Sequence, residues 1–293
     1  MTMISKITYD SANSGKANFE ETYNRLDPRS YFHRLGALDY AIPERAAPIF
    51  LRAFDAFATM RQREALTVLD IGCSYGINAA VLKYGRKMSE LRAHYEAFDE
   101  SEAGPHDVLS ADREVFASER ARRDLSIIGI DRAQFAASYA FWAGLLDDAI
   151  PENLEESDPS PHAARAMAAC DVVISTGVVG YVTERTFERI VDCQPKDELP
   201  WIASFVLRMF DYAPVAKMLD SRGYVTEKLQ GRTFRQRRFL GEAEQAHVEK
   251  ILHARGLDTE GLEANGHYLA EFFLSRPKAD AARMPMGEFL QAR

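Results

Sequence analysis

One short segment constrains the fold more than any other part of the chain. Thr67–Ile71 is an apolar and β-branched run, and the next seven residues are Gly-Cys-Ser-Tyr-Gly-Ile-Asn. This order predicts a buried strand, a turn and a helix that starts near Asn78. Gly72 and Gly76 allow a tight turn and a close approach of the backbone to a ligand. The segment therefore indicates an α/β sheet with a ligand-binding turn at a strand end.

Strand-like and helix-like segments alternate along the rest of the chain. Further strands are expected at Leu125–Ile130, Asp171–Ser175, Trp201–Leu207, Thr233–Phe239 and Tyr268–Ser275. Helices are expected at Glu44–Thr59, Asn78–Arg86, Ala133–Leu146, after Thr183, at Ala213–Arg222 and at Glu242–Arg255. Such alternation predicts a parallel sheet with helices on both faces. Ligands of these sheets bind outside the carboxyl ends of the strands, at the point where the strand order reverses.

The domain organisation follows from the same pattern. Residues 1–60 are expected to form an N-terminal helical extension, with an aromatic block that is a candidate lid. Residues 61–277 form the α/β domain, in which 87–123 is an insertion with helical fragments and no strand. Residues 278–293 are a C-terminal tail.

Composition narrows the class of partner. The 293 residues carry a net charge of −8, which argues against a nucleic-acid substrate. The arginine run Arg232–Arg238 fits the solvated face of a strand better than a nucleic-acid site. Three widely spaced cysteines predict neither a disulfide framework nor a metal site. The chain shows no signal peptide and no apolar run near the roughly 20 residues of a membrane helix. A cytoplasmic monomer or homodimer with no membrane partner is expected.

The turn resembles motif I of class I S-adenosylmethionine-dependent methyltransferases, D-x-G-x-G-x-G, with Ser74 in place of the middle glycine. The resemblance spans about residues 66–230 and implies a doubly wound, mostly parallel seven-stranded sheet. It also implies S-adenosylmethionine as cofactor, held at its methionine end by the residues of the turn. These are Asp70, Gly72, Cys73, Ser74, Tyr75, Gly76 and Asn78. A dinucleotide turn would instead be G-x-G-x-x-G, and a turn with no ligand is the remaining alternative.

Three later segments extend the resemblance. It implies that Asp131, at the end of a strand, bonds the ribose hydroxyls, although this carboxylate could equally cap the following helix. Asn153 and the amide of Leu154 fall where the adenine is bound, or they lie in a plain surface loop. Ser175, Thr176 and Gly177 would face the sulfonium, unless they are simply a buried strand and its turn. Together the four motifs predict one cofactor site.

The acceptor site is less constrained. Tyr181 and Arg208 are candidates for catalysis and substrate binding, and Tyr23, Tyr31 and Tyr40 for substrate binding. An arginine at a strand end suits a carboxylate, so an acidic or amino-acid-like metabolite is favoured. The alternatives are that the tyrosines pack as core and that Arg208 is a surface pair.

The function predicted is methyl transfer to a small molecule by direct displacement. Protein or RNA methylation, a nicotinamide-dependent oxidoreductase and a non-catalytic cofactor-binding scaffold are the alternatives.

Overall fold

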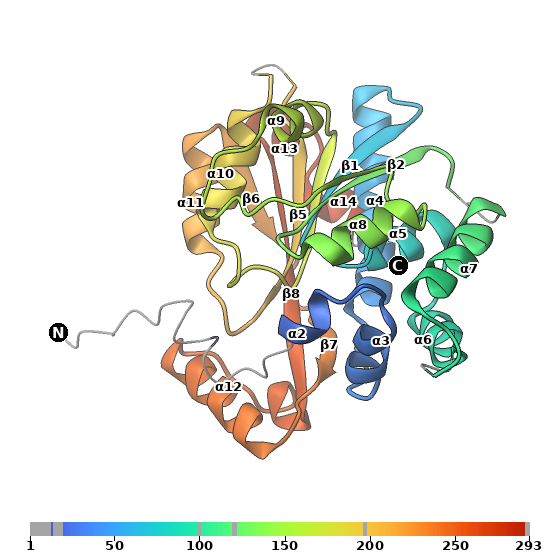
Figure 1. Ribbon diagram of the computed structural model, residues 1–293. Coiled ribbons are helices and arrows are strands. Elements are labelled where there is room, and N and C mark those ends of the chain that lie inside the picture. Colours follow the sequence, from blue (N-terminus) through green and yellow to red (C-terminus); the bar gives the residue numbers. More distant parts are fainter. Residues whose placement is uncertain (1–12, 14–19, 99–100, 119–121, 196–197, 291–293) are drawn as a thin grey trace.

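A single mixed sheet forms the centre of the computed structural model, which describes residues 13, 20–98, 101–118, 122–195 and 198–290 (Figure 1). The strands are β1 (Leu66–Ile71), β2 (Leu125–Ile130), β3 (Asp148–Ile150), β4 (Val172–Thr176), β5 (Trp201–Leu207), β6 (Tyr224–Lys228), β7 (Phe234–Arg238) and β8 (His267–Pro277). Their order is β3-β2-β1-β4-β5-β8-β6, with β7 beside β8 off this path. β1 to β5 are parallel, and β8 runs antiparallel to its neighbours. The doubly wound, mostly parallel α/β fold is therefore confirmed.

The strand count needs one correction. Seven strands were expected, but the sheet has eight. Tyr224–Lys228 was not anticipated as a strand because its sequence, Tyr-Val-Thr-Glu-Lys, lacks a continuous apolar run. β6 pairs with the second half of β8, whereas β7 pairs with the first half. The long strand β8 thus carries two consecutive partners along one edge.

Burial on both faces explains the apolar runs of the central strands. Every residue of β5 is buried, as are four of the five residues of β4. In-register pairing of β1 with β2 and β4 brings Ile71 beside Ile130 and Ser175. The carboxyl ends of these three strands therefore meet at one edge. Because β1 lies between β2 and β4, this edge is the point where the strand order reverses.

Helices cover the sheet and extend beyond its carboxyl edge. They are α2 (Glu20–Tyr23), α3 (Arg29–Gly36), α4 (Ile42–Arg61), α5 (Ile77–Tyr84), α6 (Met88–Glu96), α7 (Pro105–Ser118), α8 (Gln134–Trp142), α9 (Pro161–Ala168), α10 (Glu184–Asp192), α11 (Ala213–Ser221), α12 (Glu242–Ala254), the 3₁₀ turn η1 (Glu263–Asn265), α13 (Lys278–Arg283) and α14 (Met286–Leu290). Figure 1 shows α2 and α3 on the same side of the molecule as α12 and β7. Across the described residues, none of these helices is both long and apolar enough to cross a bilayer.

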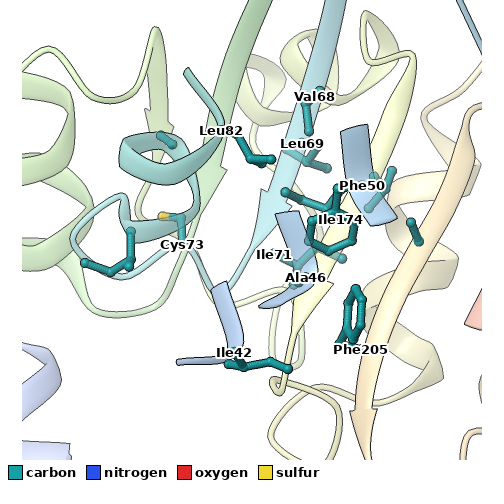
Figure 2. Close-up of a cluster of buried hydrophobic side chains, with 14 of the residues drawn as sticks. Ile42, Ala46, Phe50, Val68, Leu69, Ile71, Cys73, Leu82, Ile174 and Phe205 are labelled. Carbon is teal, nitrogen blue, oxygen red and sulfur yellow. The ribbon is translucent and has the colours of Figure 1, made fainter. Parts of the chain in front are cut away.

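Within the N-terminal extension, α4 is part of the core of the sheet rather than part of a lid. The ring of Phe50 lies 5.2 Å from that of Phe205 on β5 and 6.5 Å from that of Phe272 on β8. Figure 2 shows Ala46 and Phe50 beside Ile174 of β4. The lid interpretation is left to α2, α3 and the turn at 37–41. Residues 1–12 and 14–19 lie outside the described part of the chain.

The described residues of segment 87–123 form α6 and α7 and contain no strand. Asp112 of α7 is completely buried and accepts hydrogen bonds of 2.6 Å from the hydroxyls of Tyr95 and Tyr139. The Nε2 atom of His94 lies 2.6 Å from its other carboxylate oxygen. This cluster fastens α6 and α7 to α8.

The C-terminal tail packs onto the sheet. Asp280 of α13 accepts a hydrogen bond of 2.8 Å from the indole N–H of Trp201. Phe289 of α14 lies 5.8 Å from the same indole, and Leu290 is fully buried. Residues 278–290 therefore close the side of the sheet near α4.

Candidate active site

A cavity of about 1010 Å³ opens at the carboxyl edge of the sheet. Its walls come from the turn after β1, the end of β2, the loop after β3 and the end of β4. Further walls are formed by the loop after β4 with the start of α10, and by α2, α3, the turn at 37–41 and β7. Among the described residues, the sequence segments predicted for a cofactor thus meet in one place.

The turn after β1 uses left-handed backbone at three alternate positions. Gly72 has φ +73°, Ser74 has φ +47° and Gly76 has φ +74°. A Cβ atom at Gly72 would lie 2.7 Å from a methyl of Val178, and one at Gly76 would lie 3.0 Å from Ala140. Glycine is therefore required at both ends, while Ser74 takes the left-handed position that the motif gives to glycine.

The floor of the cavity is a polar layer under this turn. The Asn78 amide donates 2.9 Å to Asp70 Oδ1 and 2.6 Å to the hydroxyl of Thr176. Asp70 is fully buried, and it lies under the lining residues rather than among them. Burial and the nearby Asp131 raise the pKa of Asp70 to about 7, opposed by the bond from Asn78. The second carboxylate oxygen of Asp70, the hydroxyl of Ser74 and Oδ1 of Asn78 are buried without a partner among the described residues.

Asp131 lines the cavity at the end of β2. Its two carboxylate oxygens accept backbone N–H bonds from Ser74 at 2.8 Å and Ala133 at 2.9 Å. Burial raises the pKa of this carboxyl, and the two N–H donors oppose the rise. The carboxylate therefore caps the chain before α8 and also clamps the glycine turn. Each oxygen still has a lone pair for a ligand, so the capping role and the ribose role are compatible.

The loop after β3 forms the adjacent wall. Asn153 and Leu154 both line the cavity, although Asn153 Oδ1 already accepts the N–H of Glu155 at 3.1 Å. Glu155 in turn accepts the N–H groups of Thr183 at 2.9 Å and Thr186 at 3.2 Å. Burial opposes ionisation of Glu155, but these donors lower its pKa. Glu155 was not predicted as a site residue, because its partners lie about 30 positions later, at the start of α10.

Two residues of the predicted cofactor set point away from the cavity. The Ser175 hydroxyl is fully buried and donates 2.9 Å to the hydroxyl of Ser204. Side chains alternate along a strand, so Ser175 and Thr176 cannot both face the same site. The Tyr75 hydroxyl donates to the carbonyl of Arg25 at 3.0 Å and accepts the N–H of Arg25 at 2.8 Å. Tyr75 therefore anchors the N-terminal segment. Thr176, Gly177 and Cys73 do line the cavity.

The N-terminal tyrosines lie where a lid or acceptor site would be. Tyr23, Tyr31 and Tyr40 line the cavity, and the Tyr31 ring lies 5.6 Å from that of Tyr23 and 6.1 Å from that of Tyr40. Burial raises the pKa of all three phenols, that of Tyr40 to about 12, so all three are neutral at pH 7. Tyr181 lines the mouth and is 51% exposed.

Arg208 requires a correction, because it lies outside the cavity lining. Its guanidinium is buried, bonded to the carboxylate of Glu263 and to the carbonyl of Asp258, the latter at 2.9 Å. Glu271 lies 3.6 Å away. Arg208 is thus neither a surface pair nor an acceptor-binding group; it joins β5 to η1 and β8.

Gln236 and Arg237 are lining residues that the sequence analysis did not select. A strict alternation would bury only one of two neighbours in β7, but both are buried. The pairing of β7 with β8 shifts register between Arg235 and Arg238, and such a bulge turns two consecutive side chains inward. Arg237 donates to both oxygens of Glu244, at 3.0 and 2.8 Å.

Comparisons with known proteins give only distant structural likenesses. No family model matches the chain, and no curated protein sequence matches it. The fold is similar to magnesium protoporphyrin IX methyltransferase from Synechocystis PCC 6803 with bound S-adenosylmethionine, at 11% identity and TM-score 0.40, covering 94% of this chain and 98% of that one. A SAM-dependent methyltransferase from Aquifex aeolicus is similar at 12% identity and TM-score 0.39, covering 84% of this chain and 97% of that one. Precorrin-6y C5,15-methyltransferase from Geobacter metallireducens GS-15 is similar at 13% identity and TM-score 0.34, covering 78% of this chain and 86% of that one.

Proposed function

We propose that this protein transfers a methyl group from S-adenosylmethionine to a small-molecule acceptor. One observation carries the proposal. Buried acceptor atoms without a partner among the described residues, on Asp70, Ser74 and Asn78, gather at and under a left-handed glycine turn where the strand order reverses. Unpaired buried acceptors are costly unless a ligand supplies donors. A cationic ammonium group is a ligand of that kind.

The other lining residues suit the rest of the same cofactor. Asp131 offers two carboxylate oxygens to the vicinal ribose hydroxyls, and the loop at Asn153 and Leu154 faces the expected place of the adenine. Thr176 and Gly177 also line the cavity and would stand at the methyl end of the bound cofactor. When bound, S-adenosylmethionine would supply a methyl carbon activated by its sulfonium. The acceptor's lone pair would bond to that carbon while the carbon–sulfur pair stays on sulfur, and the acceptor's proton would leave to water. The cavity walls align the acceptor for this displacement.

Charge favours this cofactor over a dinucleotide. The cofactor side of the cavity is lined by four carboxylates, on Asp131, Glu152, Glu155 and Glu156, against one guanidinium, that of Arg132. A pyrophosphate would be repelled there, whereas a molecule with a sulfonium and an ammonium is attracted. The negative lining therefore supports the methyl donor and counts against a nicotinamide cofactor.

The acceptor is proposed to be small, but the preference for an acidic one has lost its support. Arg208 is occupied by Glu263 away from the cavity, and Arg237 is occupied by Glu244. Neither guanidinium is placed to take a substrate carboxylate. An uncharged acceptor fits the lining better.

Calorimetric titration with S-adenosylhomocysteine tests the cofactor assignment. We expect binding to the wild type, and Asp131→Asn should weaken it about 10- to 100-fold, the usual effect of losing bonds to a charged group. The matched control is Asp148→Asn, because Asp148 lies at the start of β3, outside the cavity lining. The proposal fails if the wild type binds no S-adenosylhomocysteine or binds a nicotinamide dinucleotide more tightly.

Transfer from labelled S-adenosylmethionine tests the acceptor class. Label should appear in a small-metabolite extract. Label found only in protein or RNA would overturn the small-molecule assignment while leaving the cofactor assignment intact.

A further inference from the structure

The acceptor end of the cavity has a distinct composition. It is walled by the rings of Tyr23, Tyr31, Tyr40 and Tyr181 and by the carboxamide of Gln236. The partly buried rings of Tyr23 and Tyr40 pack edge to face against the buried ring of Tyr31. Walls of this kind favour a flat, largely apolar molecule that can lie against aromatic rings.

The buried part of this end carries no net charge. Its buried charged side chain is Arg237, and both of its outer nitrogens donate to the carboxylate of Glu244. Arg132 also lines the cavity and lowers the pKa of Tyr181, but its side chain is exposed to solvent. Its guanidinium also lies 4.5 Å from the ring centre of Tyr268. A substrate carboxylate or ammonium brought here would be desolvated beside an already neutralised pair, which disfavours charged acceptors.

Gln236 is the polar group that stands out in this wall. Gln236 is 6% exposed, and its Oε1 has no partner among the described residues. Its amide lies against the end of β4, because a Cβ atom placed on Gly177 would lie 2.4 Å from its Nε2. An unpartnered carbonyl oxygen at this depth needs a donor from a bound molecule.

The backbone around Gln236 holds this carboxamide in a fixed place beside the tyrosines. The Gln236 carbonyl accepts the N–H of Ala41 at 2.9 Å, and the N–H of Arg238 donates to Leu38 at 2.7 Å. The side chain of Arg238 also bonds Asp39 at 2.6 Å. The turn that carries Tyr40 is therefore tied to β7, so the ring and the amide form one preorganised wall.

We propose that Gln236 is a specificity-determining residue which accepts a hydrogen bond from the hydroxyl of a neutral, planar aromatic acceptor. This deepens the methyltransferase proposal and rests on it. A site with a buried acceptor rejects an analogue that lacks the matching donor, because the carbonyl is then left unpaired. The hydroxyl recognised by Gln236 is the group by which the site selects among flat molecules of similar size.

Calorimetry on protein saturated with S-adenosylhomocysteine tests this with three matched probes. These are 2-naphthol, its methyl ether 2-methoxynaphthalene, which has no donor, and 2-naphthoate, which is anionic. We expect 2-naphthol to bind the wild type at least about tenfold more tightly than either of the others. In Gln236→Met, which keeps the size but removes the acceptor, the preference for naphthol over its ether should fall to less than about threefold.

Two variants control for folding and location. Gln194 is also a buried glutamine with an unpartnered Oε1, but it lies between α9 and α10 and outside the cavity lining, so Gln194→Met should leave the tenfold preference unchanged. Gln236→Glu keeps the shape and adds a charge, and it should instead favour 2-naphthylmethylammonium. Thermal unfolding of each variant reports whether it is folded.

Several results would overturn the inference. They are tighter binding of 2-naphthoate than of 2-naphthol, no binding of 2-naphthol, or a preference that survives in Gln236→Met. Loss of S-adenosylhomocysteine affinity in Gln236→Met as large as in Asp131→Asn would assign the amide to the cofactor instead. If wild-type protein binds no S-adenosylhomocysteine, the methyltransferase proposal fails separately, and the probe titrations on free protein still decide the role of Gln236.

Discussion

Asp70 is a carboxylate whose charge state should control cofactor binding. With its pKa raised to about 7 by burial, Asp70 is largely protonated at pH 6 and largely ionised at pH 8. Only the ionised form of Asp70 attracts an ammonium group bound at the floor of the cavity, which lies above this carboxylate. Affinity for S-adenosylhomocysteine should therefore rise with pH, by about tenfold from pH 6 to pH 8 if binding needs the ionised form. Calorimetry across this range measures the slope.

The asparagine variant isolates the cause of this pH dependence. Asp70→Asn should bind S-adenosylhomocysteine weakly and with a flat profile between pH 6 and pH 8. A slope that persists in the variant would place the titrating group elsewhere, with Asp131 as the nearest candidate because its pKa is also raised by burial.

Two glycines with similar backbone angles make it possible to separate the cost of left-handed backbone from the cost of a steric clash. Gly72 and Gly85 have φ of +73° and +67°, but a Cβ atom at Gly72 would lie 2.7 Å from Val178, while nothing lies within 4 Å of one at Gly85. Either alanine variant should lose about 1–2 kcal/mol of unfolding free energy from the left-handed backbone. Only Gly72→Ala should also abolish S-adenosylhomocysteine binding, because the turn itself must move. Equal binding by both variants would contradict this role of the turn.

At the scale of single elements, local pattern predicted the strand ends well. The apolar runs of β1, β2, β4 and β5 and the acids that end β1 and β2 are all properties of contiguous sequence. The errors arose where one element depends on another. Ser175 shares a strand end with Thr176, but its side chain points to the opposite face and meets Ser204 of the next strand. Gln236 is turned inward by a bulge in the pairing of β7 with β8. The alternating arginines of this segment give no sign of the bulge.

The role of Arg208 also depends on an element that is distant in the sequence. Its partner Glu263 is 55 positions later in the chain, so no local pattern pairs them. Arg208→Met should lower the free energy of unfolding by about 3–5 kcal/mol, because it leaves a buried carboxylate without its cation. S-adenosylhomocysteine affinity should stay within about twofold, since Arg208 is not at the cavity.

Urea unfolding and calorimetry on the same preparations measure the two effects. Lys278→Met is the matched control, because Lys278 pairs with Asp220 at 3.0 Å on the surface and should change stability by less than about 0.5 kcal/mol. A large loss of cofactor affinity in Arg208→Met, with stability unchanged, would restore Arg208 to the active site.

At the scale of the whole molecule, the acceptor site is assembled from segments that are remote in sequence. Asp39 and Arg238, which tie the aromatic turn to β7, are 199 positions apart. The cofactor end, by contrast, is built from successive strand ends of one sheet. The sequence therefore predicts the cofactor end segment by segment, whereas the composition of the acceptor end depends on the closure of the N-terminal and C-terminal segments over the sheet.

Charge distribution over the molecule bears on whether RNA can be the acceptor. The net charge is −8, and two of the four arginines in the run 232–238 are held in ion pairs. Arg237 is buried against Glu244, and Arg238 pairs with Asp39. Phosphate binding needs several cations on one face, and each contact adds to the salt dependence of affinity. We therefore expect no measurable binding of a labelled 20-nucleotide single-stranded RNA at 50 mM salt by fluorescence anisotropy. Tight RNA binding that falls steeply as salt rises would show a polyanion site and favour RNA as the methyl acceptor. If RNA does not bind and the protein selects a neutral hydroxyl compound, the acceptor is chosen at the tyrosine-walled end of the cavity.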